Sequence, residues 1–327
     1  MDKVKKFFKS TAGMVLLVTI LVGIIVHATT GNFFTAYNIS TLTRAASFVI
    51  IVGFGQTIVL LTGGIDLSVA TIGSVCGMFG AIFMVNYGMN PYLAILIASL
   101  LGILLGAVNG FFIAYFKMTP FIVTLATMQI YKGIVYVITK GMPITGMPEA
   151  AEKLANGVIG GILPNIVIIM VLICLILTIM LKRTKFGRYI YAIGGNRSCA
   201  KIVGVPTERI EMLVYCLSGL LSAIAGVLMS SKLASFQASI GESWQMDSIT
   251  AAVLGGTSMA GGIGNVVGTI IGGVLSSVIS TCITLLRISS YWETIVTGAV
   301  VLIAVLIDAI KDNPVIQARM KRTFVRK

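Results

Sequence analysis

The chain has 327 residues, of which 57% are hydrophobic and only 11% charged, and its mean hydropathy is +1.01. Soluble chains carry about 25% charged residues, so this composition excludes a soluble globular protein and indicates an all-α membrane protein with many spans. The net charge of +13 could indicate a nucleic-acid partner, but the basic residues lie in loops between apolar runs, and we expect no nucleic acid.

Apolar runs long enough to cross about 30 Å of hydrocarbon recur along the whole chain. They lie at about 14–28, 45–62, 68–86, 92–114, 120–139, 162–181, 212–230, 248–260, 266–286 and 291–310. The pattern predicts ten transmembrane helices in a single domain over residues 1–327. The run at 248–260 is short and glycine-rich, so it is expected to be a broken or partly re-entrant helix. The first run also resembles a signal peptide with a cleavage site at Val26-His27-Ala28, and both interpretations stay open.

The distribution of basic residues orients the spans. Ten spans put both termini on one side, and with that side cytoplasmic, 18 of the 24 basic residues fall inside, as the positive-inside rule requires. The loop at about 182–211 is then cytoplasmic and the loop at about 140–161 is periplasmic. Trp244 and Trp292 fall at outer span ends, where amphipathic rings favour the headgroup layer.

Several kinds of chemistry are missing from the sequence. No GxxxxGK[ST] motif occurs, and the dipeptide Gly-Lys is found nowhere, so the chain carries no Walker A phosphate loop and is not itself an ATPase. Neither HExxH nor GxSxG is present, which argues against an enzyme. The five cysteines form no CxxC pair, so we expect free thiols and no bound metal. No cofactor is expected on this chain.

Two glycine-rich stretches, at 56–73 and 251–273, interrupt ordinary apolar helix. Paired glycines permit broken helices of the kind that line transport pathways, although plain helix packing explains them equally well. The candidate pathway glycines are Gly63, Gly64, Gly255, Gly256, Gly261 and Gly262. Asp66 is the one strong candidate for a charge within the membrane. We expect it to cap a broken helix end, with direct solute contact as the alternative.

Five ordered segments resemble the permease subunits of ribose-type bacterial ATP-binding-cassette sugar importers. They are LTGGIDLSVA, NGFFIAYFKMTPFIVTLATM, KFGRYIYAIGGNRSCAKIVGV, DSITAAVLGGTSMAGGIGNVVGT and SSYWETIVTGAVVLIAVLID. The resemblance implies import of a monosaccharide through a homodimeric or pseudodimeric pore in the bacterial cytoplasmic membrane. It also implies a cytoplasmic ATPase subunit that binds ATP and Mg, and an extracytoplasmic sugar-binding protein. The particular sugar and the choice between homodimer and heterodimer stay open.

The cytoplasmic loop carries the signals of a short capped helix. Asn196 is a good N-cap, Gly204 suits the C-cap and Pro206 forbids continuation, so a helix is predicted over Arg197–Val203, with Thr207 capping the next one. With the resemblance, we interpret this helix as the element that couples the ATPase, with an apolar ridge in an ATPase groove and a basic side facing acidic residues there. The coupling residues are Gly194, Gly195, Asn196, Arg197, Ala200, Lys201, Val203 and Gly204. The alternative is a generic basic loop.

Polar residues within apolar spans are candidates for solute contact. Besides Asp66 they are Gln56, Asn109, Thr124, Thr127 and Gln129, although hydrogen bonds between helices explain them equally well. Outside, a short amphipathic helix is predicted over Pro148–Ala155, and Lys153, Lys232 and Arg287 are candidate contacts of the binding protein, with a solvated loop as the equally supported alternative. A proton-coupled sugar carrier with Asp66 as its relay is the alternative function, and a passive channel is a third.

Overall fold

The structure is a computed structural model that describes residues 11–160, 163–289 and 291–312. Its first helices are α2 (Thr11–Thr30), α3 (Ala36–Leu61), α4 (Val69–Val85), α5 (Pro91–Phe116), α6 (Pro120–Thr139), α7 (Glu149–Asn156) and α8 (Asn165–Arg183). They are followed by α9 (Lys185–Gly195), α10 (Arg197–Ile202), α11 (Thr207–Lys232), α12 (Trp244–Leu254), α13 (Val266–Leu285) and α14 (Tyr291–Asp312). Two short antiparallel pairings join β1 (Ile144–Thr145) to β4 (Ser235–Phe236) and β2 (Val158–Ile159) to β3 (Leu163–Pro164).

The helices fall on the predicted apolar runs. Within the described ranges, seven of them, α2, α3, α5, α6, α8, α11 and α13, are long and apolar enough to cross a membrane. Helix α4 is apolar and slightly shorter, whereas α12 stops after 11 residues, as the glycines that follow it led us to expect. The predicted all-helical, multi-span class is therefore confirmed, while the number of ten crossings stays a prediction. The lysines before Thr11 and the basic residues after Asp312 lie outside the described residues.

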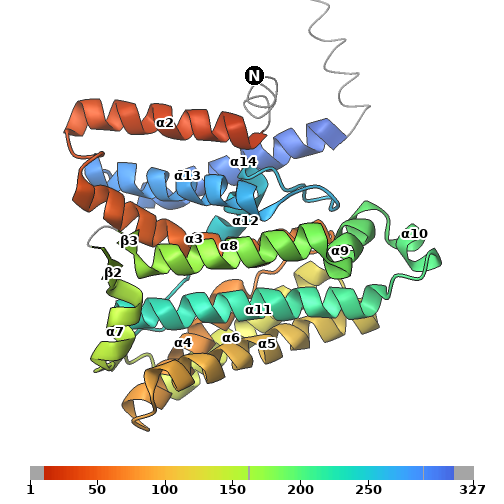
Figure 1. Cartoon of the computed structure of the whole chain (residues 1–327), viewed down its shortest axis with the longest axis horizontal. Helices are drawn as coiled ribbons and strands as arrows, with labels where there is room; N and C mark the ends of the chain where they lie inside the picture. Colours follow the sequence, from red (N-terminus) through yellow and green to blue (C-terminus); the bar gives the residue numbers. More distant parts are fainter. Residues whose placement is uncertain (1–10, 161–162, 290, 313–327) are drawn as a thin grey trace, which may run out of the picture.

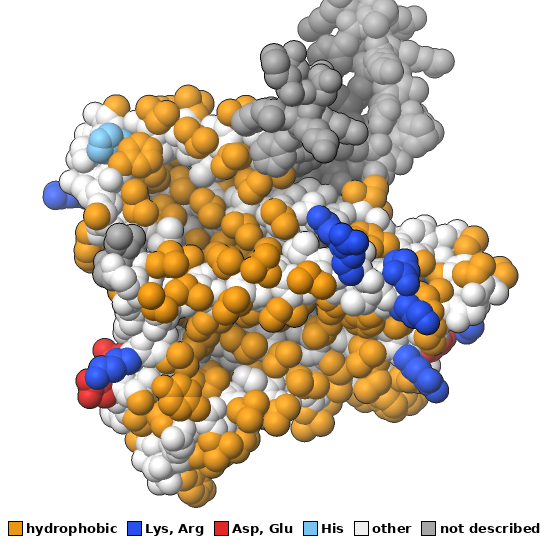
Figure 2. Space-filling view, viewed as in Figure 1, with side chains coloured by type: hydrophobic (Ala, Val, Ile, Leu, Met, Phe, Trp, Pro, Cys, Tyr) orange, Lys and Arg blue, Asp and Glu red, His pale blue; other side chains and the backbone are white. Residues whose placement is uncertain are grey.

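Helix α11 lies toward the front of the bundle in Figure 1 and packs against α3, α4 and α5. Most of α3 is buried, whereas α2, α5, α6 and α8 each expose most of their length. In the face drawn in Figure 2, hydrophobic side chains cover the bundle and charged side chains gather at its two ends. This is the surface that a bundle needs when its sides face lipid tails and its ends face water.

Small residues bring α4 and α5 against α11. A Cβ atom on Gly102 of α5 would overlap the carbonyl oxygen of Gly219 on α11, and one on Gly226 of α11 would overlap the backbone of Gly73 on α4. Lipid tails are as apolar as leucine, so helices in a membrane gain little from burying apolar area and depend on close packing of this kind. The glycines therefore hold three helices in direct backbone contact.

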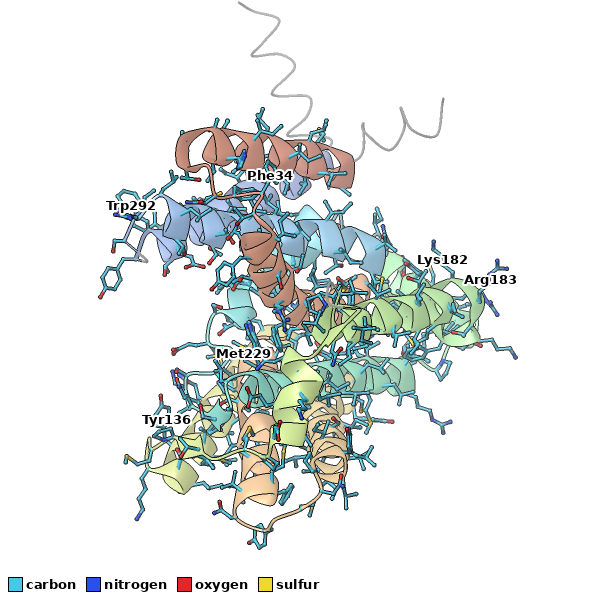
Figure 3. All side chains as sticks on the ribbon, turned by 60° about the vertical axis from the view of Figure 1, so that its left-hand side comes forward. Phe34, Tyr136, Lys182, Arg183, Met229 and Trp292 are labelled. Carbon is cyan, nitrogen blue, oxygen red and sulfur yellow. The ribbon has the colours of Figure 1, made fainter. Side chains whose placement is uncertain are left out.

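The two ends of the bundle carry different residues. Helix α7 lies at one end and α9 and α10 at the other (Figure 1). Lys182 and Arg183 project at the α10 end, whereas Tyr136 and Trp292 lie at the opposite end (Figure 3). Trp244, expected at the headgroup layer, is instead buried and stacks on Phe48 with ring centroids 6.2 Å apart. That expectation was wrong because the ring packs inside the bundle against Phe48, Gly73 and Gly241.

Candidate translocation and coupling sites

Asp66 lies in the break between α3 and α4 and is fully buried. Its Oδ1 accepts hydrogen bonds from the backbone N–H of Ser68 at 3.0 Å and from the Ser68 hydroxyl at 2.6 Å. Its Oδ2 accepts from the hydroxyl of Ser218 on α11 at 2.8 Å. The carboxyl group thus accepts a hydrogen bond from the backbone N–H just before α4 begins, which is close to the expected capping role. It also joins the break between α3 and α4 to α11.

The hydrogen bonds continue from Asp66 into two further helices. Asn109 of α5 donates from Nδ2 to the Ser68 hydroxyl at 2.7 Å, and Thr127 of α6 donates to Asn109 Oδ1 at 2.7 Å. We call Ser218, Asp66, Ser68, Asn109 and Thr127 the buried polar chain. Three of the predicted solute contacts are therefore brought together, but inside the bundle and bonded to one another.

The remaining predicted solute contacts lie in different surroundings. Thr124 is buried and donates to the carbonyl oxygen of Pro120 at 2.9 Å. Gln56 is buried in α3, and among the described residues neither of its amide atoms has a hydrogen-bond partner. Gln129, at the middle of α6, is exposed and lines a cavity.

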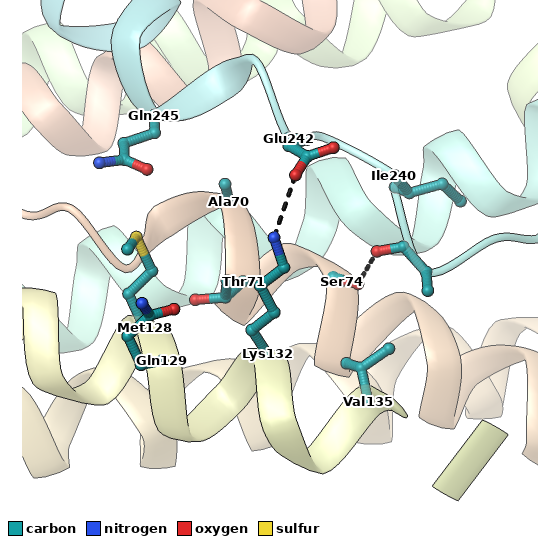
Figure 4. A pocket seen from close by; sticks show the side chains of 11 residues that line it. Ala70, Thr71, Ser74, Met128, Gln129, Lys132, Val135, Ile240, Glu242 and Gln245 are labelled. Atoms are coloured by element: carbon teal, nitrogen blue, oxygen red, sulfur yellow. Dashed lines mark hydrogen bonds and ion pairs between the residues drawn. The ribbon is translucent and has the colours of Figure 1, made fainter. Parts of the chain in front are cut away.

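This cavity, which we call the α6 cavity, has a volume of about 230 Å³. It lies between α4, α6 and the segment that leads into α12 (Figure 4). Its lining residues are Ala70, Thr71, Ser74, Met128, Gln129, Lys132, Val135, Ala238, Ile240, Glu242 and Gln245. The Lys132 Nζ lies 3.1 Å from Glu242 Oε1, and the Ser74 hydroxyl donates to the Ala238 carbonyl at 3.3 Å.

Sequence reasoning missed most of this cavity. Lys132 was not among the predicted site residues, although it lies well inside the predicted span 120–139. A lysine at such a position is costly unless it reaches water or a partner, and that cost was the available signal. Glu242 and Gln245 carried no such signal, because they belong to a loop whose path depends on the tertiary fold.

The two glycine-rich breaks meet at the end of α9. The Gly262 N–H donates to the Leu61 carbonyl at 3.0 Å, and Gly63, Gly261 and Gly262 have φ values of 79°, 93° and 72°. A Cβ atom on Gly194 would overlap both the Leu61 carbonyl oxygen and the Gly262 nitrogen. We call Gly63, Gly194, Gly261 and Gly262 the glycine junction. It places the segment before α10 in backbone contact with both breaks.

The other candidate pathway glycines contact protein rather than a cavity. A Cβ atom on Gly64 would overlap the Tyr215 hydroxyl, and one on Gly255 would overlap the backbone of Gly268 on α13. Gly256 follows in a turn with φ of 92°. For these positions the geometry is that of close packing and chain reversal, the alternative that the sequence had left open.

Helix α10 is the short capped helix predicted in the loop at about 182–211. Asn196 Oδ1 accepts the Cys199 N–H at 2.9 Å, and Gly204 ends the segment with φ of 82°. The helix covers Arg197–Ile202, one residue less than predicted. Thr207 was predicted to cap α11 but is its first residue. Pro206 occupies the N-cap position instead. The Thr207 hydroxyl donates to Glu208 Oε2 at 3.0 Å.

The basic side of α10 is turned toward α11, which corrects the sequence interpretation. Arg197 forms a two-pronged ion pair with Glu211, at 2.8 and 2.5 Å, and the Glu211 side chain is only 6% exposed. Lys201 lies 3.1 Å from Glu208, which also binds Lys117 of the α5 C-cap at 2.9 Å. The acids expected on another subunit are thus found in this chain, since α11 runs directly beneath α10.

The apolar side of α10 also differs from the prediction. Ala200, expected on the exposed ridge with Val203, is buried. Ile202 and Val203 are 84% and 78% exposed and project from the end of the helix. We call this pair the α10 tip. The ridge is therefore a projecting tip that includes Ile202, which the sequence did not single out.

Helix α7 caps the other end of the bundle. Its Ala151 and Ala155 are buried, and Asn156 donates from Nδ2 to the Lys232 carbonyl at 2.9 Å. Arg44 of α3 donates to the Asn156 carbonyl at 3.0 Å. The exposed Glu149 pairs with Lys153 at 2.7 Å, and this hydrogen bond and charge hold the pKa of Glu149 below its ordinary value.

The three basic residues predicted to contact the binding protein are not equally accessible to a partner. Lys153 is exposed beside Glu149, whereas the Lys232 ammonium lies 5.4 Å from the centre of the Phe48 ring and is half-buried. Arg287 lies just beyond α13 with φ of 55°. The three side chains therefore do not form one basic patch of equal exposure.

A bundle of long apolar helices, broken twice at glycines and carrying a capped helix at one end, defines a multi-pass membrane transport subunit. Residues 38–305 match a family described as the permease component of branched-chain amino acid transport systems, and the chain belongs to this permease family. The resemblance found in the five sequence segments is confirmed. Permeases of this class contain no ATPase of their own.

Curated relatives match nearly the whole chain. The ribose import permease RbsC of Bacillus subtilis is 43% identical over 291 residues, covering 88% of this chain and 90% of that protein. RbsC of Escherichia coli K12 is 39% identical, covering 89% and 92%. The xylose transport permease XylH of the same strain is 30% identical, covering 86% and 87%. No solved structure matches the chain.

Proposed function

We propose that this chain is the permease subunit of an ATP-binding-cassette importer that carries ribose or a closely related monosaccharide across the bacterial cytoplasmic membrane. The observation that carries the proposal is the 43% identity to a ribose import permease over nine-tenths of both chains. The xylose permease among the relatives supports a pentose as the solute class.

In this proposal a separate ATPase subunit, which binds ATP and Mg, docks at the α10 end. The exposed Ile202 and Val203 of the α10 tip seat in its groove, since apolar side chains exposed at 84% and 78% beyond the hydrocarbon indicate a protein partner. Moving a two-state transporter from 1:99 to 99:1 requires about 5.5 kcal/mol of differential binding. Helix α10 can pass on such energy because ion pairs fasten it to α11 and the glycine junction fastens α9 to both breaks.

At the opposite end, the proposal places the sugar-binding protein on α7. The buried alanines of α7 and its hydrogen bonds to α3 and α11 hold this helix in place. The exposed Glu149–Lys153 pair presents one negative and one positive charge to a partner. We further propose ten crossings with both termini in the cytoplasm, and a second copy of this chain as the other half of the pore. The broad apolar sides of α5, α6 and α8 offer surface for both lipid and that copy.

The proton-coupled carrier is less favoured. A proton relay needs a carboxyl group that exchanges protons with water, whereas Asp66 is fully buried and accepts three hydrogen bonds from serines. A branched-chain amino acid is a second candidate solute, because the description of the matched family names it. It enters the experiment as a competing solute.

Reconstitution of the purified complex in liposomes tests the proposal. The chain is studied alone and with the ATPase and binding protein that co-purify, using labelled ribose, xylose and leucine with and without ATP. We expect sugar uptake only with ATP and all partners, unaffected by a protonophore. Uptake by the chain alone that a protonophore abolishes would establish the proton-coupled carrier, passive flux would establish a channel, and uptake of leucine alone would overturn the sugar assignment.

A further inference from the structure

We propose that the α6 cavity is a saccharide subsite that each protomer contributes to the pore, where the sugar binds during its passage through the membrane. This inference rests on the proposed function and adds to it the location of solute contact. It assigns direct contact to Thr71, Gln129, Glu242 and Gln245 in place of the buried polar chain.

The size of the α6 cavity suits a monosaccharide. Pockets for drug-sized ligands span about 300–1,000 Å³, and at about 230 Å³ the α6 cavity lies just below that range. A five- or six-carbon sugar is correspondingly smaller than a drug molecule. A cavity of this size would accept one sugar molecule and little else.

The chemistry of the lining also suits a sugar. Each sugar hydroxyl donates one hydrogen bond and accepts others, so a subsite needs both kinds of group on more than one side. Gln129 and Lys132 reach the cavity from α6, while Glu242 and Gln245 reach it from the opposite wall (Figure 4). Met128 and Ile240 supply apolar surface for the C–H faces of the ring.

The ion pair across the cavity can open at little cost. Lys132 and Glu242 join α6 to the segment before α12, and their side chains are 46% and 69% exposed. Exposed pairs of this kind contribute about 0–1 kcal/mol, so sugar hydroxyls could replace one partner without a large penalty. The buried polar chain differs, because its members already bond to one another and no water-facing group remains to exchange.

The position of the cavity fits a solute arriving from outside. Helix α6 starts near the α10 end, where Lys117 pairs with Glu208, and ends beside β1, which pairs with β4. The cavity-lining residues Ala238 and Ile240 directly follow β4. The cavity therefore lies in the half of the bundle toward α7, the end assigned to the binding protein.

Protection from a thiol reagent tests occupancy directly. In a Cys199→Ser background, which removes the exposed native thiol, Gln129→Cys is modified with a small uncharged maleimide in the purified full-length permease. Millimolar ribose should slow modification at least about fivefold, because a bound sugar would cover that side chain. The control is Asn86→Cys, at the exposed C-cap of α4 outside the cavity, where ribose should change nothing.

Transport kinetics provide the second readout. In the ATP-driven complex, Gln129→Ala and Glu242→Gln should each raise the KM for ribose about five- to tenfold, the usual effect of losing one hydrogen bond to a ligand. The yield and the thermal midpoint of each purified complex should match those of the wild type, which shows that the variants fold and assemble. Lys140→Met, at the exposed C-cap of α6 and outside the cavity lining, is the control and should leave KM unchanged.

The outcomes separate the two proposals. If the wild-type complex imports ribose with ATP while Gln129→Cys is modified at the same rate with and without ribose, the subsite is overturned and the importer function stands. Unchanged KM in both variants would overturn it equally. If the wild-type complex imports none of the labelled sugars, the proposed function itself fails. Protection by leucine and not by ribose would reassign the cavity to another solute class.

Discussion

At the scale of single residues, Arg197 forms an ion pair within its own chain rather than with a partner subunit. Both of its terminal nitrogens bind Glu211, whose side chain is nearly buried, so the guanidinium supplies this carboxylate with two charged hydrogen-bond donors. Lys201, four residues on, is 67% exposed and shares Glu208 with Lys117. We therefore expect the ion pair of Arg197 to contribute much more to the stability of the fold than that of Lys201.

Replacing Arg197 should weaken the attachment of α10 to α11. Arg197→Ala leaves the buried Glu211 carboxylate without its partner, at a cost of about 2 kcal/mol. We expect a lower thermal midpoint of the purified permease and loss of the stimulation of ATPase activity by the binding protein. Lys201→Ala is the matched control and should change neither measurement, because exposed pairs contribute little. Equal effects of the two variants would contradict the difference argued from burial.

Asp66 allows a residue-scale test between a structural role and a proton relay. Asp66→Asn keeps an oxygen acceptor for the Ser68 groups and presents an amide to Ser218, which can accept. We expect sugar uptake to remain within about threefold of wild type. Asp66→Leu removes both acceptors and should reduce the folded yield. Uptake lost in Asp66→Asn at normal yield would favour the relay.

At the scale of elements, the glycine junction explains how a helix outside the hydrocarbon can move segments inside it. The end of α9 lies against the carbonyl oxygen that ends α3 and against the loop between α12 and α13. Tyr191 of α9 adds a hydrogen bond to the Gly264 carbonyl at 2.9 Å. A Cβ atom on Gly194 does not fit between these backbones, so we expect a displacement of α9 to be passed directly to both breaks.

Two neighbouring glycines of α9 provide a matched test of this contact. A Cβ atom on Gly194 would overlap two backbone segments, whereas one on Gly195 meets no atom within 4 Å among the described residues. Gly194→Ala should therefore abolish ATP-driven uptake or folding. Gly195→Ala should be neutral or stabilise the helix by about 0.5–1 kcal/mol. The measurements are uptake and the thermal midpoint, and a functional Gly194→Ala variant would refute the junction as a rigid link.

Helices that are determined by residues close together in the sequence could be predicted from the sequence. The apolar runs gave the helices because their length is set by the hydrocarbon itself, and Asn196 with Gly204 gave α10 because caps act within one turn. The partner of Arg197, the burial of Trp244 and the walls of the α6 cavity depend on which helices become neighbours. Asp66 was foreseen as a cap, but not as the centre of a chain of bonds across four segments.

At the scale of the whole molecule, the bundle has two unlike ends. Helix α7, with its exposed Glu149–Lys153 pair, lies at one end, and α10 with the apolar tip lies at the other (Figure 1). The basic Lys182 and Arg183 lie at the α10 end, and by the positive-inside rule we expect that end to be cytoplasmic. The orientation determines which partner can reach which end.

The native cysteines test this orientation without any substitution. Cys199 on α10 is exposed, whereas Cys76, Cys174, Cys216 and Cys282 are buried. A membrane-impermeant maleimide should therefore label the chain in inside-out vesicles and not in right-side-out vesicles. Bound ATPase should slow the labelling, because Cys199 lies beside the α10 tip. Lys153→Cys on α7 is the control and should add labelling in right-side-out vesicles. Labelling of Cys199 from the outside would reverse the topology and exclude a cytoplasmic ATPase from α10.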